Sequence, residues 1–421
     1  MEGGSNRNVA ALLVFNALRG AAVGGFMALL PMYMASIGYS MSMIGGAAAA
    51  ASLAISLLLP GAGYLIDSLG SREVTALSGA LIGLAPLIPA LTGRLSLLAV
   101  SYALFLAAFL VGQPSRMAFL ARSVSRARFG YYVGVTSTAF SASALAGPAM
   151  SGIAAERIGY QYSFIALAAL ATAGLGAFVA LSVKPPGERV ERRVGGLLEA
   201  YKRALRPSPS LAAVLGFVAL DRFSWSLWAP TLTAYLYKKG FTPGVVGGLA
   251  SLMRATNMAL LTPAGRAVDR HGAWVWIAAS EALGALGALL VGLSGGLPGV
   301  ATGMALIGSS IAFWIPSYNA VIERITPRER LGEAYSVANS VRGLSGAPGP
   351  YVGGLLYDRV AEAAPFEASA AMLVTASLVA ATIVRRAEAR GSQELGEEPS
   401  RSRGAEAEAP GRVGAPLEGG S

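Results

Sequence analysis

Five ionisable side chains stand near the middle of long apolar stretches of this sequence. They are Arg19, Asp221, Arg222, Arg254 and Arg342. A charge at the centre of an apolar segment is costly unless it faces a water-filled cavity or a partner. Arginine binds carboxylates and phosphates, and a carboxyl group can carry a proton. The set therefore predicts binding of a small anion and exchange of protons.

Helical spacing indicates which side chains surround these charges, because residues three or four apart share one face of a helix. The resulting sets are Phe15, Arg19 and Phe26; Asp221, Trp225 and Trp228; Arg254 and Asn257; and Tyr335, Asn339 and Arg342. Together they describe an aromatic-walled and mostly cationic cavity. Arg254 and Arg342 have no obvious acid partner in the sequence except Glu281, so we expect a substrate anion to complete their pairing.

Other roles remain open for these residues. Arg19 and Asp221 could form a permanent ion pair, and Glu281 could pair with another arginine, because buried charges are normally paired. Asp221 could also serve as a proton-coupling acid. For Trp225 and Trp228 alone, lipid-facing or core positions are favoured over the walls of a binding cage. The sequence has no cluster of metal ligands, nucleophile arrangement or phosphate loop, so we expect no metal, no cofactor and no enzyme.

The elements that carry these residues are predicted to be membrane-spanning helices. Of the 421 residues, 54% are hydrophobic and only 13% are charged, whereas about 25% are charged in soluble domains. A spanning helix needs about 20 apolar residues. The expected spans are 9–33, 42–66, 73–92, 95–118, 131–154, 162–183, 211–237, 243–265, 274–293, 297–322, 332–357 and 366–385. We therefore predict an all-α membrane protein with twelve transmembrane helices.

The first six spans and the last six are copies of one another. Adding 202 to a residue number carries Arg19 onto Asp221, since 221 − 19 = 202, and likewise Pro148 onto Pro350. Because six is an even number, both halves enter the membrane in the same orientation. The expected domains are an N-terminal half at 1–183, a cytoplasmic linker at 184–210, a C-terminal half at 211–385 and a disordered cytoplasmic tail at 386–421. Basic and apolar residues at helical spacing favour an amphipathic helix over a merely solvated chain in the linker.

The net charge of +10 is concentrated in alternate loops. Cytoplasmic loops are enriched in lysine and arginine, so this bias predicts a multi-pass protein of the cell membrane with both termini in the cytoplasm. No aromatic-and-basic binding module accompanies the charges. We therefore expect no nucleic-acid partner.

A short turn between the second and third spans of each half carries an acid and a base. The first copy holds Gly63, Asp67, Gly70 and Arg72, and the second holds Gly265, Asp269, Arg270 and Gly272. Glycines permit a tight turn, and an acid near a helix start meets the positive end of the helix dipole. Asp67 is thus expected to clamp a neighbouring helix in one conformation and release it in another. The alternative is a static cap or a surface ion pair worth about 1 kcal/mol or less.

Two six-helix halves with this turn resemble the major facilitator superfamily of transporters. The resemblance implies alternating access, in which the halves rock about a midplane site and the turns act as gates. Gly63, Leu65, Asp67, Gly70 and Arg72 match the family's signature. The second copy has Ala267 for the leucine and Trp274 for the base, which implies a weaker gate.

Glycine–proline motifs on the fifth and eleventh spans resemble a signature of that family's exporters. Their residues are Gly147, Pro148, Gly152, Pro350 and Gly354. Proline kinks a helix and glycine lets another helix approach, although plain packing would need the same residues. Proton-coupled exporters usually carry an arginine on the fourth span, where this chain has Tyr102, so coupling through that residue is not expected.

These patterns predict a secondary transporter that moves a small organic solute, with an organic anion as the leading class and protons as the candidate coupling ion. The expected partners are the solute, the lipid bilayer and protons, and the expected state is a monomer. Multidrug-type efflux is the nearest alternative, favoured by the glycine–proline motifs and the aromatic residues. A non-transporting receptor or assembly factor of the same fold is a third reading, against which the intact first turn argues.

Overall fold

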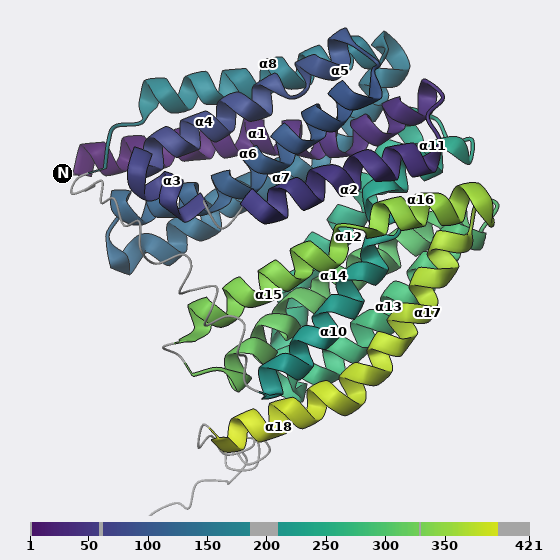
Figure 1. The fold of residues 1–421 in the computed structure, drawn as a ribbon. Coiled ribbons are helices and arrows are strands. Elements are labelled where there is room, and N and C mark those ends of the chain that lie inside the picture. The colour runs from purple at the N-terminus through teal and green to yellow at the C-terminus, as the bar shows by residue number, and fades with distance from the viewer. Residues whose placement is uncertain (1, 59–61, 186–208, 328–329, 395–421) are drawn as a thin grey trace, which may run out of the picture.

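The chain folds into two bundles of α-helices, as predicted (Figure 1). The computed structural model describes residues 2–58, 62–185, 209–327 and 330–394. The N-terminal half contains α1 (Glu2–Ser36), α2 (Met41–Leu58), α3 (Ala62–Leu69), α4 (Ser71–Leu84), α5 (Leu87–Leu91), α6 (Leu95–Ser123), α7 (Arg126–Ile158) and α8 (Tyr160–Leu181). The C-terminal half contains α10 (Pro209–Ser226), η2 (Ala229–Thr231), α11 (Leu232–Lys238), α12 (Pro243–His271), α13 (Ala273–Leu293), α14 (Leu297–Ile325), α15 (Leu331–Gly346), α16 (Gly349–Arg359), α17 (Ala364–Val379), η4 (Ala380–Val384) and α18 (Arg385–Glu394).

Several of the expected spans consist of more than one helical segment. The seventh comprises α10, η2 and α11, and the eleventh comprises α15 and α16. Pro230 and Pro348 stand at these breaks, and proline lacks the N–H that would continue the helix. In the segment expected to be a tail, the first residues belong to α18, while 395–421 lie outside the described residues, as do 186–208 of the linker.

Within the described residues, nine helices are long and apolar enough to cross a membrane. The expected spans that fall short are α2, α7 and the pair α15 and α16. These helices face the other half of the molecule: α2 packs on α16, and α7 packs on α12. Because small residues let helices approach closely, such a contact favours Gly, Ala and Ser over the leucines of a lipid-facing helix. The lower hydropathy of α7 follows from this position, whereas α2 is apolar but short, and α15 and α16 are each short.

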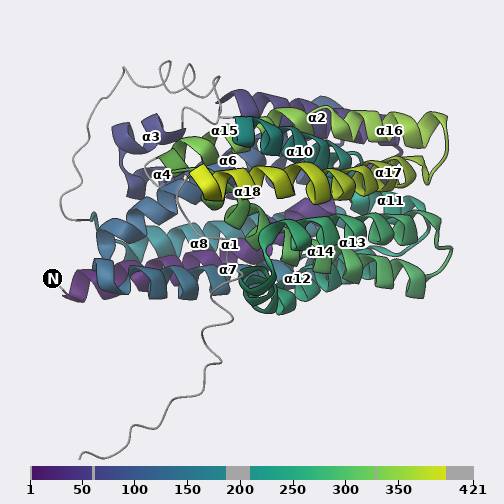
Figure 2. The same ribbon diagram turned by 90° about the horizontal axis from the view of Figure 1, so that it is seen from below.

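The two halves converge at one end of the molecule and diverge at the other (Figure 1). We call the first the closed end; it holds the turns 37–40, 157–159, 239–242 and 360–363. The opposite end, where the N-terminus, α3, α15 and α18 lie, is called the open end. The view from below shows the helices of both halves lying lengthwise beside one another (Figure 2). The charged midspan residues therefore sit between two ends that differ in how closely the halves approach.

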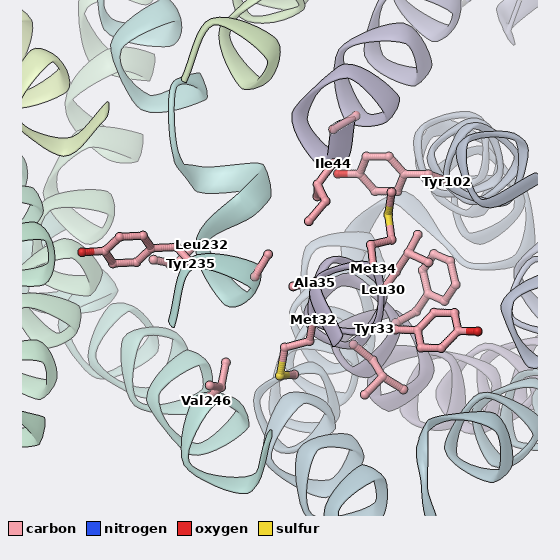
Figure 3. Close-up of a cluster of buried hydrophobic side chains, with 14 of the residues drawn as sticks. Leu30, Met32, Tyr33, Met34, Ala35, Ile44, Tyr102, Leu232, Tyr235 and Val246 are labelled. Atoms are coloured by element: carbon pink, nitrogen blue, oxygen red, sulfur yellow. The ribbon is translucent and has the colours of Figure 1, made fainter. Parts of the chain in front are cut away.

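Apolar side chains seal the closed end. Met32 and Ala35 of α1 lie on the side that faces α11 and α12, which contribute Leu232 and Val246 (Figure 3). Met32 and Val246 are fully buried, with 0% of their surface exposed. This cluster belongs to both halves, so it must be broken if the halves are to separate here.

Candidate functional site

The acids of the C-terminal half lie side by side in its interior. Asp221 of α10 is 2% exposed and Glu281 of α13 is 0% exposed. Their carboxyl groups are neighbours, and both oxygens of Glu281 lack a hydrogen-bond donor among the described residues. The positive charges nearest to Asp221 belong to Arg342 and Arg222. The acid predicted to be the proton carrier thus stands beside a second carboxyl group and two guanidinium groups.

Aromatic rings hold Arg342 in this cluster. Its guanidinium carbon lies 4.5 Å from the centroid of Trp314 and 5.5 Å from that of Tyr318. Trp225, one turn after Asp221, packs against Gly284, whose missing side chain leaves room for the indole. Trp228 is a core residue, because it is 2% exposed and donates from Nε1 to Ser369 Oγ over 2.9 Å.

Arg19 of α1 occupies the equivalent place in the N-terminal half, in different surroundings. Its side chain is 0% exposed, and Nε, Nη1 and Nη2 all lack a hydrogen-bond partner. Three phenylalanine rings surround the guanidinium group, with centroids 6.0, 5.5 and 5.1 Å away; they belong to Phe15, Phe109 and Phe140. The structure does not bring Arg19 to Asp221, so the ion pair weighed from the sequence is absent between these two described residues.

The charged neighbour of Arg19 is another arginine, which sequence reasoning missed. Arg116 of α6 lies close enough for the two positive charges to repel each other. It is 7% exposed, donates from Nη2 to Gln113 Oε1 over 2.6 Å, and leaves Nη1 without a partner. Arg116 stands near the end of the expected fourth span, where a snorkelling arginine is ordinary. Arg116 follows Phe109 by two helical turns and so shares its face of α6, which is the signal in the sequence that could have linked it to Arg19.

The remaining predicted binding residues are spread over two helices. Arg254 and Asn257 lie one turn apart on α12, both half-buried, and Asn257 Nδ2 has no hydrogen-bond partner. Asn339 is exposed on α15, one turn before Arg342. These polar groups are free to bind a solute, but neither Arg254 nor Asn257 hydrogen-bonds to the acid pair in the described structure.

The glycine–proline motifs lie where the halves touch at the closed end. A Cβ on Gly152 would come within 2.2 Å of the carbonyl oxygen of Pro243, and one on Gly247 within 2.2 Å of that of Pro148. The repeat-related contacts are equally tight, with Gly45 against Pro350 and Gly354 against Met41, at 1.9 and 2.4 Å. Such distances permit no side chain at any of these four glycines, so they allow close packing between the halves, whereas Gly147 packs on α1 of its own half, where a Cβ would come within 2.3 Å of the carbonyl oxygen of Ala21.

A hydroxyl group also enters the backbone of α7 at its proline. Ser251 of α12 donates to the carbonyl oxygen of Leu145 over 2.7 Å and accepts the N–H of Ala149 over 3.1 Å. That carbonyl and that N–H would otherwise bond to each other within the helix. Insertion of a side chain into the row of backbone hydrogen bonds is a known cause of kinks, and here it also ties α7 to the other half.

Two acids complete the contacts of the closed end. Glu156, at the end of α7, accepts hydrogen bonds from Thr242 Oγ1 and the N–H of Gly244, at 3.1 and 3.0 Å. Asp358, at the end of α16, accepts them from the N–H groups of Met41 and Ser42, at 3.1 and 2.8 Å. Each carboxylate therefore caps the first turn of a helix of the other half, where free N–H groups and the helix dipole favour negative charge.

The predicted gating turns lie at the open end. Gly70 and Gly272 have φ angles of 99° and 90°, in the left-handed region that favours glycine, and each precedes the next helix. Arg72 donates from Nε to Ser182 Oγ over 2.9 Å, which joins α4 to the end of α8.

The other gating residues are placed as follows. Gly63 and Asp67 lie in α3, and the Asp67 side chain is outside the described part. In the second copy Asp269 and Arg270 are exposed, and a Cβ on Gly265 would meet nothing within 4 Å. Within the part of the chain that the structure describes, none of these side chains hydrogen-bonds to the N-terminal half, so the gating role stays a prediction.

Two parallel six-helix halves, joined at one end around buried midspan charges, define a membrane transporter rather than an enzyme. The sequence profile of the Major Facilitator Superfamily matches residues 12–253 and 214–415. The chain belongs to this superfamily, as its turns and repeat predicted. No curated protein matches the chain.

Solved structures of transporters share the fold. A mutant of the nucleoside transporter NupG aligns with a TM-score of 0.75 at 12% identity, over 91% of this chain and 99% of that one. The human organic anion transporter MFSD10 (TETRAN) gives 0.63 at 18% identity, over 89% and 99%. A D-xylose-proton symporter gives 0.69 at 15% identity, over 90% and 97%. At these identities the likeness extends to the fold alone.

Proposed function

We propose that this chain is a secondary transporter that moves a small organic anion across the cell membrane by alternating access, coupled to protons through Asp221. The observation that carries the proposal is the segregation of charge between the halves. Arg19 and Arg116 lie close enough to repel each other and have no acid partner among the described residues, while Asp221 lies beside Glu281. A negatively charged solute would balance the first pair, and two adjacent carboxyl groups can hold a proton between them.

The positive-inside bias supports an orientation in which the closed end faces outward and both termini face the cytoplasm. The described conformation is then open to the cytoplasm. Closure of the open end and separation of the closed end would expose the same midspan groups to the outside.

The first test is thermal unfolding of the purified protein with anionic, cationic and neutral solutes. A ligand at 100 times its dissociation constant adds about 2.7 kcal/mol to the free energy of unfolding. We expect anions alone to stabilise the protein, and we expect the effect to be smaller in Arg254→Ala or Arg342→Ala. Stabilisation by hydrophobic cations, indifferent to those arginines, would instead support multidrug-type efflux, which the aromatic residues around the midspan charges favour.

The second test separates proton coupling from solute binding. In proteoliposomes, exchange of labelled for unlabelled solute needs no net proton movement, whereas uptake driven by a pH gradient does. We expect Asp221→Asn to abolish driven uptake and to retain exchange. Equal loss of both activities would contradict the coupling role, and absence of any transported solute would favour a receptor or assembly factor.

A further inference from the structure

The two halves differ at one corresponding place in a way that points to a missing anion. The offset of 202 carries Arg19 onto Asp221, Arg116 onto Tyr318 and Phe140 onto Arg342, since 221 − 19, 318 − 116 and 342 − 140 all equal 202. Each half thus combines an arginine and an aromatic ring on its fourth and fifth helices, with the two residue types exchanged. The first helix supplies an acid in one half and a base in the other.

In the C-terminal half these three positions include both a positive charge and its counter-charge. Arg342 stacks on Tyr318 and is balanced by the nearby carboxylate of Asp221. In the N-terminal half the arginine is Arg116, and the position of the acid is taken by Arg19. The same three positions therefore hold one acid and one base in the C-terminal half, and two bases in the N-terminal half.

Nothing in the described structure compensates the two positive charges. All three guanidinium nitrogens of Arg19 and Nη1 of Arg116 are buried without a hydrogen-bond acceptor. Three phenylalanine rings face Arg19, but a ring attracts a cation weakly, by about 2 kcal/mol when desolvated, and accepts no strong hydrogen bond. An uncompensated buried charge costs several kcal/mol. Two of them close enough to repel each other predict a ligand that brings negative charge.

We propose that Arg19 and Arg116 form an oxyanion site in the N-terminal half, which takes the doubly charged group of the transported solute. Planar guanidinium forks match the oxygens of phosphate and carboxylate groups in pairs. Phe109 and Phe140 are half-buried beside the fully buried Arg19, with ring centroids 6.4 Å apart. They would contact the apolar part of the solute, so an aryl phosphate is the chemical class that fits best.

This site rests on the proposed transport of an organic anion and names where its charged group binds. The test measures thermal unfolding of the full-length protein in detergent with phenyl phosphate, inorganic phosphate, benzoate and benzenesulfonate. Variants are Arg19→Met and Arg116→Met, which remove the charge and keep similar bulk. Arg72→Met is the matched control, because that arginine is already satisfied by hydrogen bonds to the end of α8.

We expect two results that a structural role for the arginines would not give. Without an anion, Arg19→Met and Arg116→Met should raise the melting temperature, because an unpaired buried charge is removed, while Arg72→Met should lower it. With phenyl phosphate, the wild type should be stabilised more than by benzoate or benzenesulfonate. Arg19→Met or Arg116→Met should weaken this binding about tenfold or more, and Arg72→Met should keep it.

Other outcomes overturn the site in distinguishable ways. Lower melting temperatures in both midspan variants, with anion binding retained, would make the arginines structural. Anion binding that depends on Arg254 and Arg342 alone would leave the proposed transport intact and refute this site. In nanodiscs, stabilisation by phosphatidic acid that phenyl phosphate does not compete with would assign the site to a lipid headgroup and overturn its role for a transported solute.

Discussion

The two carboxylates at the closed end should control how long the protein stays closed there. Glu156 and Asp358 each accept two hydrogen bonds from the first turn of a helix in the opposite half. Separation of the halves must break all four bonds. Substitution by the isosteric amides, Glu156→Gln and Asp358→Asn, keeps the shape and removes the charge. We therefore expect these variants to shift the molecule towards the conformation that is open at this end.

The size of the shift follows from the contacts. A carboxylate on a helix N-terminus stabilises by about 0.3–1 kcal/mol through the dipole, and charge-assisted hydrogen bonds exceed neutral ones by about 1 kcal/mol. Because both sites are partly solvated, we assign about 1 kcal/mol to each carboxylate, which is about a fivefold change in the ratio of conformations. The sites lie on separate helix pairs and should be additive. The double variant should change the ratio about 30-fold.

The absence of cysteine from the sequence makes the measurement direct. Spin labels on Leu91→Cys and Leu293→Cys would report the distance between the halves at the closed end, where these side chains are 83% and 60% exposed. In double electron–electron resonance measurements, the double variant should show a population with a longer distance between the labels. Glu367→Gln is the control, since this exposed acid sits in the first turn of its own helix. An unchanged distance distribution in the double variant would refute the role of the two carboxylates in closure.

Three further results are expected. Burial raises the pKa of Asp358, but hydrogen bonds from Ser42 and Met41 and the charge of Lys238 lower it overall. The contribution of Asp358 to closure is therefore complete above an ordinary aspartate pKa of about 4 and is lost as the pH falls through the lowered value. Lowering the pH should thus lengthen the spin-label distance less in Asp358→Asn than in the wild type. Gly45→Ala should prevent closure and abolish transport, because its Cβ would lie 1.9 Å from a backbone oxygen, whereas Gly46→Ala, with 3.5 Å to its nearest neighbour, should keep activity. Glu388→Gln should lower the free energy of unfolding by about 1 kcal/mol by breaking the ion pair with Arg324, and adding Arg324→Gln should cost little more.

Much of this architecture can be predicted from the sequence, because it depends on the internal repeat and on hydropathy. The offset of 202 and the spans follow from patterns along one chain, whereas most residues of the expected gating turns lie in helices α3 and α12. The sorting of the midspan charges does not, because it depends on how helices face each other. Arg19 and Asp221 are repeat-related and opposite in charge, which suggested a pair, yet each turns into its own half. Arg116 escaped notice because a basic residue near a span end is ordinary.

The closed end and the midspan site obey different symmetry, and this separates their roles. Glu156 contacts Gly244 while Asp358 contacts Ser42, and the offset of 202 relates each partner of one contact to a partner of the other. Contacts of the form i to j and j to i are those of an isologous dimer, so two copies of one half could close in this way. Closure can stay symmetric because each half only has to meet the other. A solute with one charged group and one apolar body has no such symmetry. The exchange of acid and base at Arg19 and Asp221 is the change that would let two like halves bind it in a single orientation.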